Sequence, residues 1–181
     1  MSERPFIPVT FAVLTISDTR DLDEDKSGAT LVERIRAAGH ALGAREIVKD
    51  DIAAIRAKVN SWARDETIDA IITTGGTGFT GRDVTPEALE PLFEKRMEGF
   101  SVLFHKISAD KIGTSTIQSR ATAGLLNQTF VFVLPGSPGA CRDAWDGILK
   151  DQFDYRHMPC NFVEIMPRLD EHLKRGAGQI V

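Results

Sequence analysis

The sequence predicts an α/β fold built on a sheet with parallel strands. Short apolar stretches typical of buried strands occupy residues 11–16 (FAVLTI), 68–72 (IDAII) and 129–134 (TFVFVL). Each is followed, after a polar or glycine-containing loop, by a segment whose apolar residues recur at helical spacing. Asn127-Gln128 predicts a turn directly before the last strand, and a hairpin there would make the sheet mixed.

The 181-residue length suits a single domain covering residues 1–181, and 42% hydrophobic with 27% charged residues is an ordinary globular composition. The formal net charge is −4 and Lys and Arg are scattered, so no nucleic-acid partner is expected. No apolar run approaches the roughly 18 residues that span a bilayer, and no apolar signal segment follows the first residues. We therefore expect a cytoplasmic protein with no membrane partner.

The cysteines and histidines show no metal-binding pattern. Cys141 and Cys160 form no CxxC pair, and we interpret both as reduced thiols of the core. The four histidines are far apart in the sequence. A zinc site is therefore not predicted.

Residues 68–89 form a strand, a glycine loop and the start of a helix. Three glycines in the loop remove the Cβ atoms that would keep a ligand from the backbone, and they permit positive φ; the loop is Gly75, Gly76, Thr77 and Gly78. An anion would fit there, although the loop matches neither GxxxxGK[ST] nor GxGxxG. Thr85 is predicted to cap the following helix, with Pro86 in its first turn.

Asp83 lies between this glycine loop and the helix. A carboxylate would repel a phosphate unless a divalent cation bridges the two, so Asp83 is our first candidate for a metal-linked role. The alternative is a turn residue that accepts hydrogen bonds from its own backbone. Spacing alone leaves both open.

A second acidic pair precedes the helix that begins near residue 52. Asp51 is well placed to cap that helix, which leaves Asp50 without an obvious structural role. Because the carboxyl ends of parallel strands meet at one edge of a sheet, Asp50 and Asp83 are expected to lie on the same edge.

Two further junctions could contribute to a site at this edge. The acidic loop after residue 16 offers Ser17, Asp18, Ser27 and Gly28. The simpler interpretation is a mobile acidic loop, with Ser27 as the cap of the helix that follows it. The turn Pro135, Gly136 and Ser137 offers donors at a helix start, and a plain turn explains it equally well.

Residues 99–107 predict a helix of their own. Gly99 is interpreted as a cap, and the next apolar residues are expected to face inward: Phe100, Leu103, Phe104 and Ile107.

Several motifs in order resemble the molybdenum cofactor biosynthesis family that contains MoaB, MogA and domains of gephyrin. They are TTGGTGFTGRDVTPEAL at 73–89, MEGF at 97–100, SR at 119–120 and LPGSPGA at 134–140, and the resemblance runs from about Val9 to about Leu149. The segments IGTSTIQSRATAG and PGSPGACRDAWDGIL are closer to the MoaB type.

The resemblance implies a three-layer α/β sandwich with a mostly parallel, mixed central sheet, assembled as a homo-oligomer, either trimer or hexamer. It also implies adenylylation of molybdopterin by ATP with Mg²⁺, releasing pyrophosphate. Asp50 and Asp83 would then be the catalytic carboxylates and metal ligands, with Asp51 as the alternative to Asp50. Substrate would contact Ser17, Asp18, Ser27, Gly28, Gly75, Gly76, Thr77, Gly78, Ser119, Arg120, Pro135, Gly136 and Ser137.

Two other functions remain open from the sequence. One is a non-catalytic protein that binds or carries molybdopterin, and the other is a scaffold that binds neither ligand.

Overall fold

The computed structural model describes residues 4–173, which contain one six-stranded sheet of order β2-β1-β3-β6-β5-β4. The ends of the predicted domain, residues 1–3 and 174–181, lie outside this part. The strands are β1 (Thr10–Ile16), β2 (Ala41–Val48), β3 (Ala70–Thr74), β4 (Lys95–Arg96), β5 (Thr122–Leu126) and β6 (Thr129–Leu134).

Four neighbouring strands, β2, β1, β3 and β6, run parallel, while β5 pairs antiparallel with both β6 and β4. The predicted hairpin connects β5 to β6. Its two turn residues, Asn127 and Gln128, have φ of 46° and 67°, which suits the tight turns that match strand twist. The mixed sheet is therefore confirmed.

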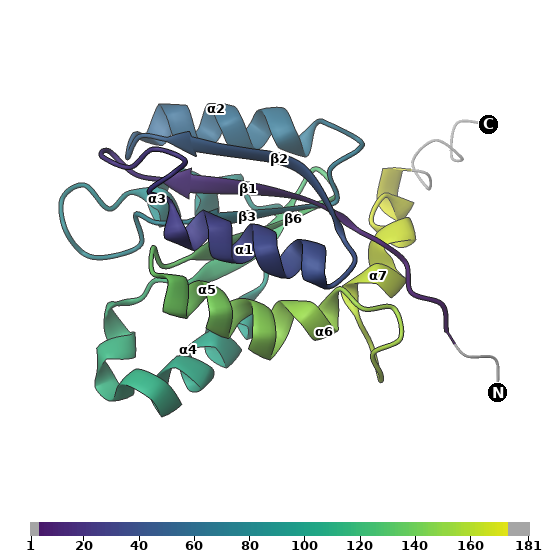
Figure 1. Ribbon diagram of the computed structural model, residues 1–181. Coiled ribbons are helices and arrows are strands. Elements are labelled where there is room, and N and C mark those ends of the chain that lie inside the picture. Colours follow the sequence, from purple (N-terminus) through teal and green to yellow (C-terminus); the bar gives the residue numbers. More distant parts are fainter. Residues whose placement is uncertain (1–3, 174–181) are drawn as a thin grey trace.

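Helices lie on both faces of the sheet (Figure 1). Their bounds are α1 (Lys26–Ala37), α2 (Ile52–Ala63), α3 (Thr85–Leu89), α4 (Glu98–Ile112), α5 (Pro138–Ala144), α6 (Lys150–Gln152) and α7 (Phe162–Ile165). A π-helical turn (Trp145–Leu149) joins α5 to α6, and 3₁₀ turns occupy Glu90–Leu92, Gly113–Gln118 and Met166–Arg168.

Two hydrophobic cores, one on each face, make this a three-layer sandwich. Along β1, Phe11 and Val13 pack on the side of α1, α4 and α5, whereas Ala12 and Leu14 pack on the side of α2 and α3. A strand buried on both faces must be apolar at consecutive positions, which is the pattern that predicted it.

Several local predictions were wrong. Gly99 lies in the first turn of α4 rather than capping it, and Leu103 is 42% exposed. Cys141 is buried as expected, but Cys160 is exposed. β2 was not among the strands predicted above, and it carries small and polar residues that an edge strand tolerates.

The loops that follow β1, β2, β3 and β6 meet at the carboxyl edge of the parallel strands, where the loops after β1 and β3 project at the left of Figure 1. Within residues 4–173, no helix combines the length and apolar character needed to cross a membrane.

Candidate functional site

A cavity of about 470 Å³ lies at this carboxyl edge. Most of its lining comes from four loops, each following a different parallel strand, and Gln118 is added from the 3₁₀ turn before β5. Its lining residues are Ile16, Ser17, Asp18, Thr19, Arg20, Asp50, Gly75, Gly76, Thr77, Gly78, Arg82, Asp83, Gln118, Pro135 and Gly136. The expectation that Asp50 and Asp83 lie at the same edge is therefore confirmed.

The first two glycines of the loop are required by its geometry. Gly75 and Gly76 have φ of 111° and 63°, values that residues with a Cβ atom rarely adopt. A Cβ on Gly75 would lie 2.2 Å from the carbonyl oxygen of Ile16, and one on Gly76 would lie 2.9 Å from Oδ1 of Asp50. Only glycine at these two positions therefore lets the loop approach the end of β1 and the Asp50 carboxylate.

The backbone amides of this loop are available to a ligand. Among residues 4–173, the N–H groups of Gly76, Thr77 and Gly78 have no acceptor, although Gly75 donates to the carbonyl of Leu134. Successive free amides in a turn suit a phosphate or another anion.

Asp50 is the only one of the three cavity carboxylates that accepts no hydrogen bond from a side chain of the described residues. Burial raises the pKa of Asp50, and the negative charges of Asp18 and Asp83 raise it further, against the opposing effects of the Arg82 charge and of a hydrogen bond from the backbone of Asp18. Asp51 caps α2 by accepting from the amide of Ala54 at 2.8 Å, as predicted. Of this acidic pair, Asp50 is therefore the residue left for a cation.

Asp83 is turned toward its own loop. Its Oδ2 accepts from the amide of Thr80 at 2.9 Å and from the Thr80 hydroxyl at 2.6 Å. A Cβ on Gly78 would lie 2.8 Å from the same oxygen. Both interpretations of Asp83 thus have support, because it closes a turn and also lines the cavity.

Asp18 and Arg82 form an ion pair at the cavity. Nε and Nη2 of Arg82 donate to the two carboxylate oxygens of Asp18 at 2.9 and 2.8 Å, and Oδ1 also accepts from the amide of Asp50 at 3.3 Å. The guanidinium of Arg82 lowers the pKa of Asp18, helped by that amide against partial burial.

Arg120 is not among the residues that line the cavity, and it binds backbone carbonyls of the glycine loop. Its Nε donates to the carbonyls of Thr77 and Gly78 at 2.9 and 3.0 Å, Nη2 donates to the carbonyl of Asp83 at 3.1 Å, and Nη1 pairs with Glu87. In this structure its donors serve the loop and not the cavity. Ser119 lies beside it, outside the cavity lining, with its carbonyl bound to His105.

Thr85 does not cap α3, contrary to prediction. The capping position is Val84, and the buried Thr85 hydroxyl donates to the carbonyl of Gly75 at 2.9 Å. The helix start is therefore tied directly to the glycine loop.

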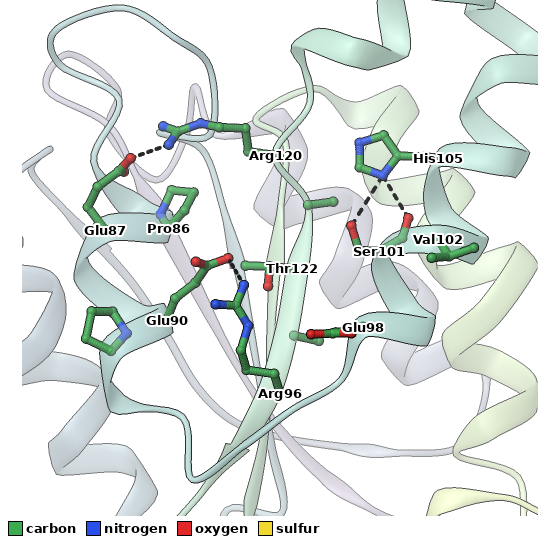
Figure 2. A pocket seen from close by; sticks show the side chains of 13 residues that line it. Pro86, Glu87, Glu90, Arg96, Glu98, Ser101, Val102, His105, Arg120 and Thr122 are labelled. Atoms are coloured by element: carbon green, nitrogen blue, oxygen red, sulfur yellow. Dashed lines mark hydrogen bonds and ion pairs between the residues drawn. The ribbon is translucent and has the colours of Figure 1, made fainter.

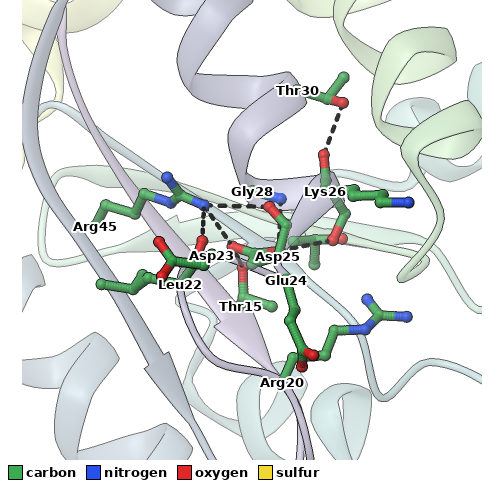
Figure 3. A network of polar contacts seen from close by, with 12 residues as sticks. Thr15, Arg20, Leu22, Asp23, Glu24, Asp25, Lys26, Gly28, Thr30 and Arg45 are labelled. Atoms are coloured by element: carbon green, nitrogen blue, oxygen red, sulfur yellow. Dashed lines mark hydrogen bonds and ion pairs between the residues drawn. The ribbon is translucent and has the colours of Figure 1, made fainter.

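Ser27 and Gly28 are not among the residues that line the cavity. Gly28 lies in the network of polar contacts shown in Figure 3. Asp25 is the residue that caps α1, and its buried carboxylate accepts from the Ser27 hydroxyl and the Gly28 amide at 3.1 and 2.8 Å. A Cβ on Gly28 would lie 2.0 Å from that carboxylate. The prediction that Ser27 caps this helix was wrong.

The turn after β6 is divided between two roles. Pro135 and Gly136 line the cavity, whereas Ser137 caps α5 by accepting from the amide of Ala140 at 3.1 Å. A Cβ on Gly136 would lie 3.1 Å from Cα of Gly75, so this turn closes onto the glycine loop.

Comparisons with known proteins identify the family of this chain. A family model described as "Probable molybdopterin binding domain" matches residues 12–155. The chain belongs to the molybdenum cofactor biosynthesis family. Molybdenum cofactor biosynthesis protein B of Escherichia coli (strain K12) is 46% identical over 157 residues, covering 87% of this chain and 92% of that relative.

Solved structures of the molybdenum cofactor biosynthesis family share the fold. A crystal structure of Molybdenum cofactor biosynthesis protein B has a TM-score of 0.83 at 38% identity, covering 93% of this chain and 99% of that one. A structure of MogA has a TM-score of 0.67 at 23% identity, covering 92% and 98%. The predicted family and three-layer α/β fold are confirmed, whereas the ligand contacts of individual residues stay predictions, as does the homo-oligomer.

Within residues 4–173 of this family member, no three His, Cys, Asp or Glu side chains are grouped so that they alone could hold a metal ion. Mg²⁺ commonly binds through one or two carboxylates together with substrate phosphates. The carboxylate of Asp50, which no side chain of the described residues engages, and the unused amides of the loop fit such a shared site, with Asp83 of the same cavity as the second carboxylate.

A second pocket of about 680 Å³ lies on the far side of Arg120, between α3 and α4 (Figure 2). Its charges are largely paired with each other: Glu87 with Arg120 and Glu90 with Arg96. Both ring nitrogens of His105 contact carbonyls, those of Ser101 and Ser119. The smaller cavity is the better candidate because, among the described residues, its Asp50 has no side-chain hydrogen-bond donor and several of its amides have no acceptor.

Sequence reasoning did not assign a role to four residues of the cavity: Thr19, Arg20, Arg82 and Gln118. Arg82 is adjacent to Asp83 in the sequence, and this position could have indicated that it belongs to the site. Its partner Asp18 is 64 residues away in the sequence and gave none.

Proposed function

We propose that this protein binds molybdopterin and adenylylates it with Mg²⁺ and ATP, releasing pyrophosphate. The observation that carries the proposal is that the Asp50 carboxylate, which no side chain of the described residues engages, lines one cavity with the free amides of Gly76, Thr77 and Gly78. Family membership and the name of the Escherichia coli relative support the pathway.

The reaction joins the terminal phosphate of molybdopterin to the α-phosphorus of ATP. A phosphate oxygen of the pterin attacks that phosphorus, the bond to the bridging oxygen of the β-phosphate breaks, and pyrophosphate leaves. The protein's contribution would be orientation and stabilisation of charge on phosphate oxygens, without a covalent intermediate.

The cavity residues divide this work. The loop amides would donate to phosphate oxygens, and because they are fixed by Arg120 and Thr85 they need no rearrangement. Asp50 and Asp83 would hold Mg²⁺, which when bound neutralises charge on the phosphates. Pro135 and Gly136 would close the wall opposite Asp50.

Incubation with ATP, Mg²⁺ and molybdopterin should yield adenylylated pterin and pyrophosphate. Asp83→Ala should abolish the yield while circular dichroism shows an intact fold, and Asp110→Ala, an exposed acid on α4, should leave it unchanged. Absence of product, under conditions in which a MogA preparation is active, would refute the enzymatic proposal.

A non-catalytic molybdopterin carrier is the second candidate. It is favoured by Asp83, whose carboxylate is engaged by Thr80. Calorimetry separates the two functions: a carrier binds molybdopterin and shows no heat with Mg²⁺ and ATP.

A further inference from the structure

Arg82 and Asp18 connect two loops across the candidate cavity. Asp18 follows β1, Arg82 lies between β3 and α3, and both line the cavity. The two N–H groups of the guanidinium face the two carboxylate oxygens, at 2.9 and 2.8 Å. This fork geometry is the one that arginine also uses to bind phosphate.

The pair is open to solvent. The side chain of Arg82 is 68% exposed and that of Asp18 is 34% exposed. Exposed ion pairs contribute little to stability, so a competing anion can displace Asp18 at small cost. Loss of this exposed ion pair should therefore cost the fold less stability than loss of a buried ion pair would.

The cavity lining carries charges of both signs, and these bear on which anion Arg82 binds. Its lining carries three carboxylates, Asp18, Asp50 and Asp83, and two guanidiniums, Arg20 and Arg82. Arg20 makes one long contact of 3.4 Å, to the carbonyl of Gly136, so Arg82 is the guanidinium engaged with a carboxylate. A polyphosphate entering the cavity meets this guanidinium and the free loop amides.

We propose that Arg82 is a phosphate-binding residue that exchanges partners: it is held by Asp18 in the ligand-free protein and transfers to a di- or triphosphate when one binds. Asp18, once released, lies beside Asp50 because its Oδ1 already accepts from the Asp50 amide. The free carboxylate is then available near the cation. The assignment of ATP as the source of the phosphates rests on the proposed function.

The test uses the two residues of the ion pair, because the exchange predicts effects of opposite sign. Dissociation constants for inorganic tripolyphosphate and for ATP are measured by calorimetry at fixed Mg²⁺. Arg82→Ala should weaken binding about tenfold or more, since charge-assisted hydrogen bonds are lost. Asp18→Asn should tighten binding, by up to about fivefold, since the guanidinium no longer has to leave a carboxylate.

The double variant separates release of Arg82 from simple charge repulsion. In the Arg82→Ala background, Asp18→Asn removes only repulsion between Asp18 and the phosphates. The exchange predicts that most of the gain from Asp18→Asn disappears in this background. Arg82→Lys, which keeps the charge and loses the fork, should bind with intermediate affinity.

A matched ion pair elsewhere provides the control. Arg34 also donates through two N–H groups to one carboxylate, that of Asp146 at 3.0 and 3.1 Å, away from the cavity. Arg34→Ala and Asp146→Asn should leave both dissociation constants unchanged.

The outcomes separate this inference from the proposed function. Opposite effects of the two single variants support the exchange even if no pyrophosphate is ever released. If both single variants weaken binding equally, or if wild type fails to bind tripolyphosphate, the exchange is wrong. It is also wrong if adenylyl transfer proceeds and Arg82→Ala leaves KM for ATP unchanged, although the proposed function would then stand.

Discussion

Asp25 and Asp50 are two aspartates at the same edge of the sheet, reached from the neighbouring strands β1 and β2, and they sit in opposite environments. The Asp25 side chain is fully buried and accepts hydrogen bonds from Thr15, Ser27, Gly28 and Arg45 (Figure 3). Asp50 is half-buried, lines the cavity and accepts no hydrogen bond from a side chain of the described residues, its donor being the backbone of Asp18.

Their protonation follows from these contacts. Burial alone would raise the pKa of Asp25, but its four hydrogen-bond donors together hold that pKa below the ordinary value. For Asp50, burial and the neighbouring acids outweigh the opposing effects of the Arg82 charge and of one backbone hydrogen bond from Asp18, so its pKa is raised. An acid surrounded by side-chain donors stabilises the fold, whereas an acid without them is available to a ligand.

Asp50→Asn should give the largest effect and should separate activity from stability. We expect kcat for adenylyl transfer to fall roughly 10²- to 10³-fold, because the amide keeps the shape of the side chain and removes the charge that would hold the cation. The melting temperature should not fall. Steady-state pyrophosphate release and thermal unfolding measure the two quantities.

Asp51→Asn is the matched control for that variant. Asn caps helices as well as Asp does, so α2 should persist and kcat should stay within about twofold. A large loss of activity with Asp51→Asn and none with Asp50→Asn would reverse the assignment of the two acids.

Asp25→Asn should show the reverse pattern, with a loss of stability. The amide cannot accept from all four donors and leaves Arg45 facing a neutral group, so we expect about 3 kcal/mol of destabilisation. For a chain of this size that corresponds to a fall in Tm of roughly 6–12 °C. Asp146→Asn, in an exposed ion pair, should change Tm by no more than about 2 °C.

The comparison of Asp25 with Asp50 also shows which parts of the structure could be predicted from the sequence. The strands and the shared edge were predictable, because apolar runs and glycine junctions are local patterns, as in residues 129–134. Asp51 as the cap of α2 was predictable for the same reason. Local spacing also isolated Asp50, since it was the acid without a local structural role.

The contacts that hold the site were not predictable. Asp25 has partners 10 and 20 residues away, Thr15 and Arg45, and Arg120 binds carbonyls more than 35 residues away. Thr85 had the local pattern of a cap, but its hydroxyl donates to a carbonyl of the glycine loop. Such choices depend on tertiary packing, which no local pattern records.

Gly28→Ala tests whether that glycine serves Asp25 or a ligand. Its Cβ would lie 2.0 Å from Oδ2 of Asp25 and 2.8 Å from the hydroxyl of Thr15, so the network must shift. We expect about 2 kcal/mol of destabilisation, measured by chemical unfolding. Molybdopterin and ATP affinities should be unchanged in the folded fraction.

Gly99→Ala is the control for this substitution. Gly99 lies in α4 with open space around its Cα, so alanine should be neutral or should stabilise by up to about 1 kcal/mol. Equal effects at the two glycines would show that the Asp25 network is not tightly packed.

The smallest effect concerns pH, and its sign differs between the two acids. Because the pKa of Asp50 is raised on folding, its ionisation costs stability, and this cost appears as pH rises from about 4 through the folded pKa. Asp50→Asn should therefore be more stable than wild type at pH 8, by roughly 0.5 kcal/mol after allowance for solvent screening. The difference should shrink toward zero near pH 4.

For Asp25 the linkage runs the other way. Its pKa is lowered on folding, so its contribution is complete above the unfolded pKa of about 3.9 and is lost as pH falls through the folded value. The stability gap between wild type and Asp25→Asn should therefore stay constant from pH 8 to 5 and narrow only at lower pH. Thermal unfolding of wild type and both variants from pH 8 to about pH 3 measures the two slopes, and slopes of the same sign would mean that folding lowers the pKa of Asp50 as it lowers that of Asp25.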